Sequence, residues 1–192
     1  MSNDTQKQSQ YDKMIKTPIP KLVVTLAIPT ILSMMITSVY NMADTAFVGQ
    51  LGNSASGAVG VVFGFMAVIQ AVGFMFGQGA GSMIAMQLGK QDGDSAGAAA
   101  STGFFVALLT GILISVLGFL FLDPLVFFLG STETIAPYAK TYMIFILLSA
   151  PFMVVCFVMN NILRYEGKAA LGMIGLMTGG VLNIICDPIF MF

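Results

Sequence analysis

Charge, histidine and tryptophan are scarce or absent in this chain of 192 residues. Only 9% of the residues are charged, there is no histidine or tryptophan, and the two cysteines, Cys156 and Cys186, lie inside apolar runs. A soluble domain carries about 25% charged residues, so the deficit excludes a globular surface exposed to water. Without histidine or a cysteine cluster, we expect no zinc, haem or other cofactor. The net charge of −1 argues against a nucleic-acid partner.

Long apolar runs dominate what is present, since 57% of the residues are hydrophobic. The runs do not alternate with period two, as barrel strands do, so they favour membrane-spanning helices. We therefore predict an all-α membrane protein, a polytopic bundle of transmembrane helices behind a polar cytoplasmic segment, residues 1–17. The predicted helices are about 18–44, 55–88, 95–121, 134–163 and 169–191.

The basic residues predict the orientation of these five spans. Alternate connectors lie on the same side of a membrane, and cytoplasmic loops carry an excess of Lys and Arg. Seven of the eight basic residues fall on the N-terminal side, and only Lys140 lies near the other. This bias predicts a multi-pass protein of the cell membrane with a cytoplasmic N-terminus. The seven are Lys7, Lys13, Lys16, Lys21, Lys90, Arg164 and Lys168.

Asp44 is the first candidate functional residue, because residues 22–43 and 45–89 carry no charge. An ionisable side chain in hydrocarbon costs several kcal/mol or more unless it is paired, wetted or neutralised. An interfacial position near a helix end is the simpler alternative. Three polar residues precede Asp44 on the same helical face and are candidates for lining a cavity: Thr37, Tyr40 and Asn41.

A second polar pair, Asn183 and Asp187, lies four residues apart on the last predicted helix. That helix runs outward like the first one, so Asp187 and Asp44 are expected at similar depth. Two acids in a poorly solvated place favour retention of a proton by one of them. Alternatively, carboxylate and amide oxygens suit a hard cation such as Na⁺. Asp187 before Pro188 is also consistent with a simple helix terminator.

Prolines and glycines inside the predicted helices require a structural explanation. Pro29 and Pro151 lie within helices and predict kinks there. The predicted helix 55–88 is longer than the hydrocarbon layer. Its Gly77–Gly81 segment is therefore either a bend or a site of close helix packing.

Four motifs together resemble the multidrug and toxic compound extrusion (MATE) transporters. They occur in the order and spacing of that family, with Pro29-Thr30 ahead of them, and the resemblance covers about residues 18–192. The motifs are Tyr40–Gly52, Gly77–Ser82 with Leu88-Gly89, Arg164–Gly167 and Asn183–Phe190.

The resemblance implies twelve helices in two lobes of six, which export organic cations and drugs in exchange for H⁺ or Na⁺. It implies an N-lobe cation site at Asp44, Asn183 and Asp187, with Na⁺ or H⁺ as the ion and Asn160 at a further polar position. This sequence departs from the family in length, since the sixth helix and the second lobe are absent. We therefore expect five helices of an N-lobe, truncated before helix 6, whose partners are drugs, membrane lipid and the remaining helices.

Three alternatives belong to other functional classes. A lipid-linked oligosaccharide flippase of the same superfamily needs cationic side chains for phosphates, and none lies mid-span. A non-transporting membrane scaffold needs no paired acids. An intramembrane hydrolase is the least favoured, because no histidine and no Ser/Lys constellation lies within the spans, and we do not expect an enzyme.

Overall fold

The computed structural model describes residues 16–50 and 52–191, apart from the side chains of residues 40, 183, 184 and 186–191. Most of the predicted segment 1–17 thus lies outside the described residues. The described residues form helices and no strands, which confirms the all-α class. The helices are α2 (Ile19–Gln50), α3 (Asn53–Gly89), α4 (Gly93–Leu120), α5 (Leu122–Phe128), α6 (Ala136–Tyr165) and α7 (Ala169–Met191).

Four of these helices are long and apolar enough to cross a membrane: α2, α3, α4 and α6. The part of α7 that qualifies as apolar, Ala169–Leu182, is shorter. Large apolar side chains remain exposed along the bundle, such as Leu109 (65%) and Phe152 (72%). Such a surface is stable against lipid rather than water, as expected of a multi-pass membrane protein.

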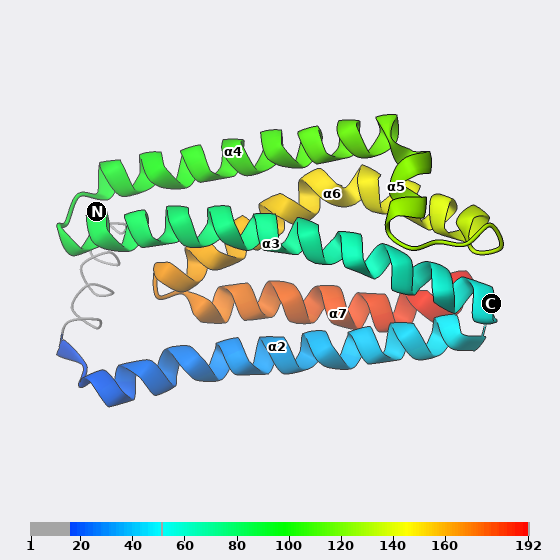
Figure 1. Cartoon of the computed structure of the whole chain (residues 1–192). Coiled ribbons are helices and arrows are strands. Elements are labelled where there is room, and N and C mark those ends of the chain that lie inside the picture. The colour runs from blue at the N-terminus through cyan, green and yellow to red at the C-terminus, as the bar shows by residue number, and fades with distance from the viewer. Residues whose placement is uncertain (1–15, 51, 192) are drawn as a thin grey trace.

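An up-and-down bundle is formed by the helices α2, α3, α4, α6 and α7 (Figure 1). In it, α2, α4 and α7 run in one direction, while α3 and α6 run in the other. The ends of α2 and α7 therefore lie at the same end of the bundle (Figure 1).

The buried core lies among α3, α4 and α6, which pack against one another. Its fully buried members include Ile69 on α3, Ala107 on α4 and Leu147 on α6. The pair α2 and α7 forms a second unit, joined to the first by fewer contacts with α3 and α6. The bundle thus consists of a three-helix core and a two-helix layer beside it.

The first helix extends beyond its predicted end at residue 44 and continues to Gln50. No proline or charge interrupts residues 45–50, and the chain turns only at Gly52, whose φ of +112° is accessible mainly to glycine. Asp44 therefore lies inside α2, almost two turns before its end.

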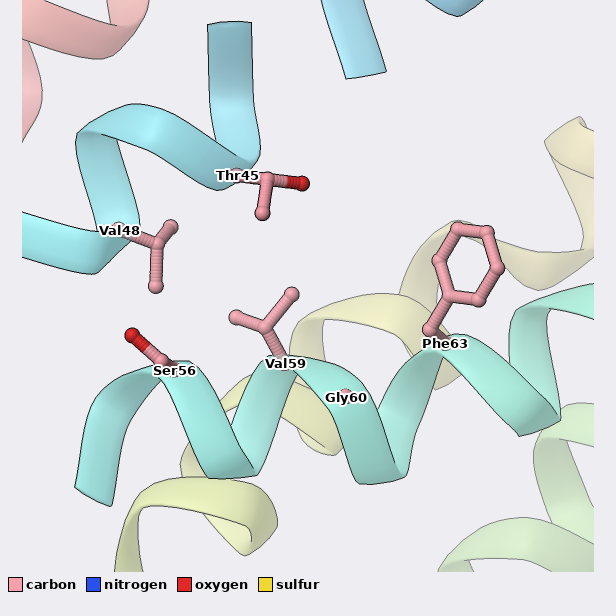
Figure 2. Close-up of a pocket in the computed structure, with 6 residues that line it drawn as sticks. All are labelled: Thr45, Val48, Ser56, Val59, Gly60 and Phe63. Atoms are coloured by element: carbon pink, nitrogen blue, oxygen red, sulfur yellow. The ribbon is translucent and has the colours of Figure 1, made fainter. Parts of the chain in front are cut away.

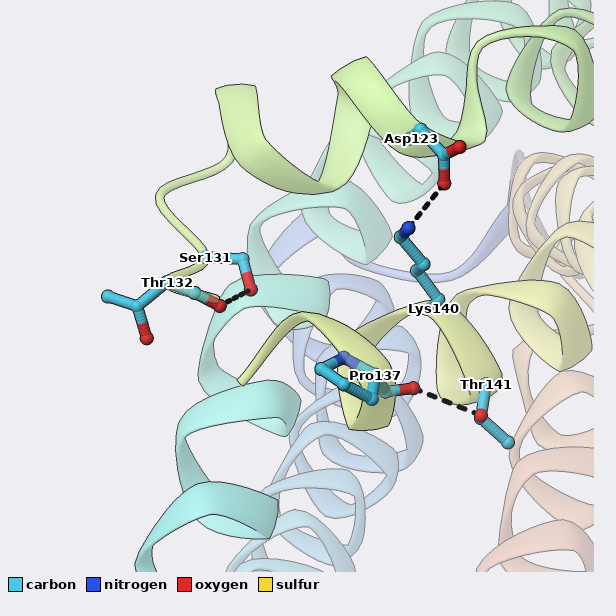
Figure 3. A network of polar contacts seen from close by, with 6 residues as sticks. All are labelled: Asp123, Ser131, Thr132, Pro137, Lys140 and Thr141. Carbon is cyan, nitrogen blue, oxygen red and sulfur yellow. Dashed lines mark hydrogen bonds and ion pairs between the residues drawn. The ribbon is translucent and has the colours of Figure 1, made fainter. Parts of the chain in front are cut away.

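A short helix, α5, lies between α4 and α6, in the interval between the predicted helices 95–121 and 134–163. Asp123 lies in its first turn and forms an ion pair with Lys140 on α6, with 2.6 Å between Oδ1 and Nζ (Figure 3). The same ammonium group lies 6.0 Å from the centre of the Phe127 ring. These contacts hold α5 across the start of α6.

Gly77 and Gly81, in the segment predicted as a bend or a packing site, serve close packing. Gly77 and Gly81 are buried within an uninterrupted α3. An added Cβ at Gly77 would lie 2.9 Å from Asn161 Cβ, and one at Gly81 would overlap the Tyr165 ring, 2.7 Å from its Cγ. Both partners belong to α6, so the missing side chains let α3 and α6 approach closely.

Candidate functional site

The two helices that carry the predicted acids are neighbours. α2 packs along α7, and the two run in the same direction with their ends at the same end of the bundle (Figure 1). Asp44 lies on α2 and Asp187 on α7. The topology therefore brings together the helix ends that bear the two carboxylates.

The polar residues predicted near Asp44 differ in exposure. Asp44 and Thr37 are half-buried, whereas Asn41 is exposed. The Thr37 hydroxyl donates to the carbonyl oxygen of Ser33 across 2.8 Å, one turn earlier in α2. The face predicted from spacing is thus partly buried at Thr37 and Asp44 and exposed at Asn41.

A cavity of about 260 Å³ lies between the end of α2 and the start of α3 (Figure 2). The Thr45 hydroxyl donates to the Asn41 carbonyl across 2.8 Å, and the Ser56 hydroxyl donates to the Gly52 carbonyl across 3.2 Å. Both hydroxyls donate to carbonyl oxygens one turn earlier in the chain, and the wall is chiefly apolar. Its residues are Thr45, Val48, Ser56, Val59, Gly60 and Phe63.

Asn160 joins α6 to α7. Its Nδ2 donates to the carbonyl oxygen of Gly172 across 3.2 Å. Asn183 is eleven residues further along α7, roughly 16 Å at 1.5 Å per residue. Asn160 therefore lies at a different level of α7 from Asn183 and Asp187, at a contact between two helices.

The ligand set predicted for a cation extends beyond the described side chains. The side chains of two predicted ligands, Asn183 and Asp187, are not described, and neither is that of Tyr40, which was predicted to line the cavity. Their backbones belong to α7 and α2. Among the side chains that are described, no three His, Cys, Asp or Glu residues gather to hold a metal ion. The cation site and its choice of H⁺ or Na⁺ stay predictions.

Sequence reasoning did not single out the α3 wall of the cavity or the buried Ser115 of α4. Ser56 gave a weak signal as a hydroxyl beside a glycine-rich turn. Ser115 is 9% exposed and donates its hydroxyl to the carbonyl oxygen of Leu147 on α6. A proline four residues after Leu147 was the available signal, because proline leaves that carbonyl without its usual donor.

A known family shares both the sequence and this architecture. Residues 29–189 match the MatE family. The match covers most of the chain, and the chain belongs to this family of membrane transporters.

Individual relatives agree with that assignment. The chain is 28% identical to the multidrug export protein MepA of Staphylococcus haemolyticus over 97% of its own length and 41% of that protein. It is 30% identical to an FAD transporter of Shewanella oneidensis, over 93% of this chain and 40% of that one. The chain thus spans about two fifths of the length of these curated relatives.

Solved structures share the fold. A transporter of the MOP superfamily from Pyrococcus furiosus superposes with a TM-score of 0.88 at 31% identity, over 94% of this chain and 40% of that one. A multidrug resistance MATE transporter in an outward-facing conformation gives the same values.

Proposed function

We propose that this chain forms the N-terminal lobe of a multidrug efflux antiporter, which exports organic cations across the cell membrane in exchange for H⁺ or Na⁺. The observation that carries the proposal is the parallel packing of α2 and α7, whose acid-bearing ends lie together (Figure 1). Kinship with the MepA multidrug exporters supports the drug class of substrate.

In this proposal Asp44, Asn183 and Asp187 hold the coupling cation between α2 and α7. Carboxylate and amide oxygens are the ligands that a hard cation prefers, and two nearby acids equally suit a single shared proton. Release of the ion on one side and of the drug on the other follows from alternating access between two lobes. Asn160 takes a coupling role, since it ties α6 to the helix that carries two of the ligands.

The charge distribution favours cationic over anionic substrates. One relative is an FAD transporter, and FAD carries phosphate groups that call for basic partners. The basic residues of the described spans lie near their ends, at Lys21, Lys140 and Arg164. The middles of the spans offer no cation to a phosphate, so we propose organic cations as the substrates.

We further propose that the N-terminal side of the bundle faces the cytoplasm. The start of α2, the end of α3 and the link between α6 and α7 lie at one end of the bundle (Figure 1). These places hold Lys21, Lys90, Arg164 and Lys168, while Lys140 lies at the other end. Such an excess of basic residues marks the cytoplasmic side.

Asp44→Asn in the complete transporter tests the proposal. We expect it to abolish drug resistance of host cells while the protein stays in the membrane, because the amide neither carries the charge nor exchanges the proton. Asp123→Asn is the matched control, since its carboxylate is 72% exposed outside the proposed site. Wild-type resistance in Asp44→Asn would overturn the assignment.

Transport in vesicles distinguishes the coupling ion and the substrate. Efflux of a fluorescent organic cation is measured with a pH gradient alone and with a Na⁺ gradient alone, and FAD is added as a competitor. A response to one gradient without inhibition by FAD supports antiport of organic cations. Transport of the dye without either gradient would contradict ion coupling.

A further inference from the structure

Pro151 breaks the hydrogen bonding of α6 at a defined carbonyl. It lies inside the helix Ala136–Tyr165 and has no N–H to donate. The carbonyl oxygen of Leu147, four residues earlier, therefore loses its usual partner. In a membrane such a group must find another donor, because no water is available to replace it.

That donor comes from a different helix. The Ser115 hydroxyl on α4 donates to the Leu147 carbonyl oxygen, and Leu147 is fully buried. A serine in a helix commonly donates to its own helix, as Ser101 does to the Gly97 carbonyl across 3.1 Å. Ser115 instead bonds across the interface to the carbonyl that the proline leaves unpaired.

The face of α4 that carries Ser115 also leaves space for the turn of α6 from Leu147 to Pro151. An added Cβ at Gly111 would lie 2.5 Å from Pro151 Cα. One at Gly118 would overlap the Leu147 side chain, 3.0 Å from its Cδ1. Gly111, Ser115 and Gly118 are spaced by four and three residues, so they share one face of the helix. That face of α4 therefore carries the hydroxyl donor, Ser115, and on either side of it a glycine that leaves space for α6.

We propose that Ser115 is a positioning residue: it replaces the missing amide of Pro151, fixes the course of α6 at this proline, and so places the C-terminal half of α6 against α7. That half carries Asn160, whose side chain donates to the Gly172 carbonyl of α7. The course of α6 after Pro151 thus determines how Asn160 meets α7. This role of Ser115 concerns the geometry of α6 and does not depend on the identity of the coupling ion.

Spin labels on the two halves of α6 measure how these halves are placed relative to each other in the complete protein. Tyr138 and Met159 are exposed and lie on opposite sides of Pro151. They are changed to cysteine in a protein in which Cys156 and Cys186 are serine. We expect Ser115→Ala to shift or broaden the distance distribution between the labels. Ser115→Thr keeps a hydroxyl and should restore the original distribution.

Ser101→Ala is the matched control, because it removes a serine hydroxyl from the same helix without touching α6. It should leave the distribution unchanged. An unaltered distribution in Ser115→Ala would overturn the proposal.

A double mutant separates this role from general packing. In Pro151→Ala the residue regains an N–H, so the Leu147 carbonyl no longer needs Ser115. We expect Ser115→Ala to lower the melting temperature in the native background and to have little effect when added to Pro151→Ala. If Ser115→Ala alone does not fold, the double mutant should. Equal losses in both backgrounds, or a double mutant that also fails to fold, would contradict the proposal.

Discussion

The Nδ2 of Asn160 on α6 and the carbonyl oxygen of Gly172 on α7 are 3.2 Å apart and form a hydrogen bond between the helices. An added Cβ at Gly172 would lie 2.9 Å from the same Nδ2. The contact thus depends both on the amide of Asn160 and on the absence of a side chain at residue 172. It also joins α6 to the α2–α7 layer.

We expect Asn160→Ala to destabilise the protein by about 0.6 kcal/mol, a typical value for a hydrogen bond between membrane helices. Gly172→Ala should also destabilise the native protein, because the new methyl group meets the amide. In the Asn160→Ala background the same change should cost less, since the amide is gone. Unfolding in detergent micelles measures all three, and strictly additive losses would exclude this contact.

Because α3 packs closely on α6, alanine substitutions at two glycines of α3 should differ in their effect on stability. Gly81→Ala should destabilise by about 1–3 kcal/mol, because its Cβ would overlap the Tyr165 ring near its base, 2.7 Å from Cγ. Gly79→Ala is the matched control, with nothing within 4 Å of its Cβ, and should be neutral or slightly stabilising. Thermal unfolding of the two variants measures the difference. Similar melting temperatures would contradict the packing role.

The N-terminus of α4 predicts a dependence of stability on pH. The Asp92 carboxylate accepts a hydrogen bond from the Ser95 backbone N–H across 3.0 Å, and its hydrogen bonds with Ser95 lower the pKa of Asp92. A lowered pKa contributes stability that is present above the unfolded value, about 3.9, and is lost as the pH falls through the folded one. Asp92→Ala should therefore destabilise at pH 7 and progressively less towards pH 3.

Asp94→Ala is the matched control. It removes a carboxylate from the first turn of α4 and leaves the N-cap residue, Asp92, in place. Melting temperatures of both variants across this pH range provide the comparison. A penalty for Asp92→Ala that stays constant with pH would show that the cap does not titrate.

The sequence predicted the helical class, the long helices and the bounds of α7, because long uncharged runs have few alternatives in a membrane. It also predicted the family, which the match over residues 29–189 confirms. It placed the end of the first helix too early, since no residue after Asp44 stops a helix until Gly52. The short helix α5 was missed because seven residues give little periodic signal.

The residue types and their spacing on single helices follow from the sequence alone, since one turn of helix fixes which side chains share a face. Type and spacing therefore suffice to make Asp44, Asn183, Asp187 and Asn160 candidates. Contacts between helices depend on rotation and depth, which no local pattern contains. Only the tertiary structure placed α2 beside α7, Asn160 on Gly172, and Ser115 on the carbonyl that Pro151 leaves unpaired.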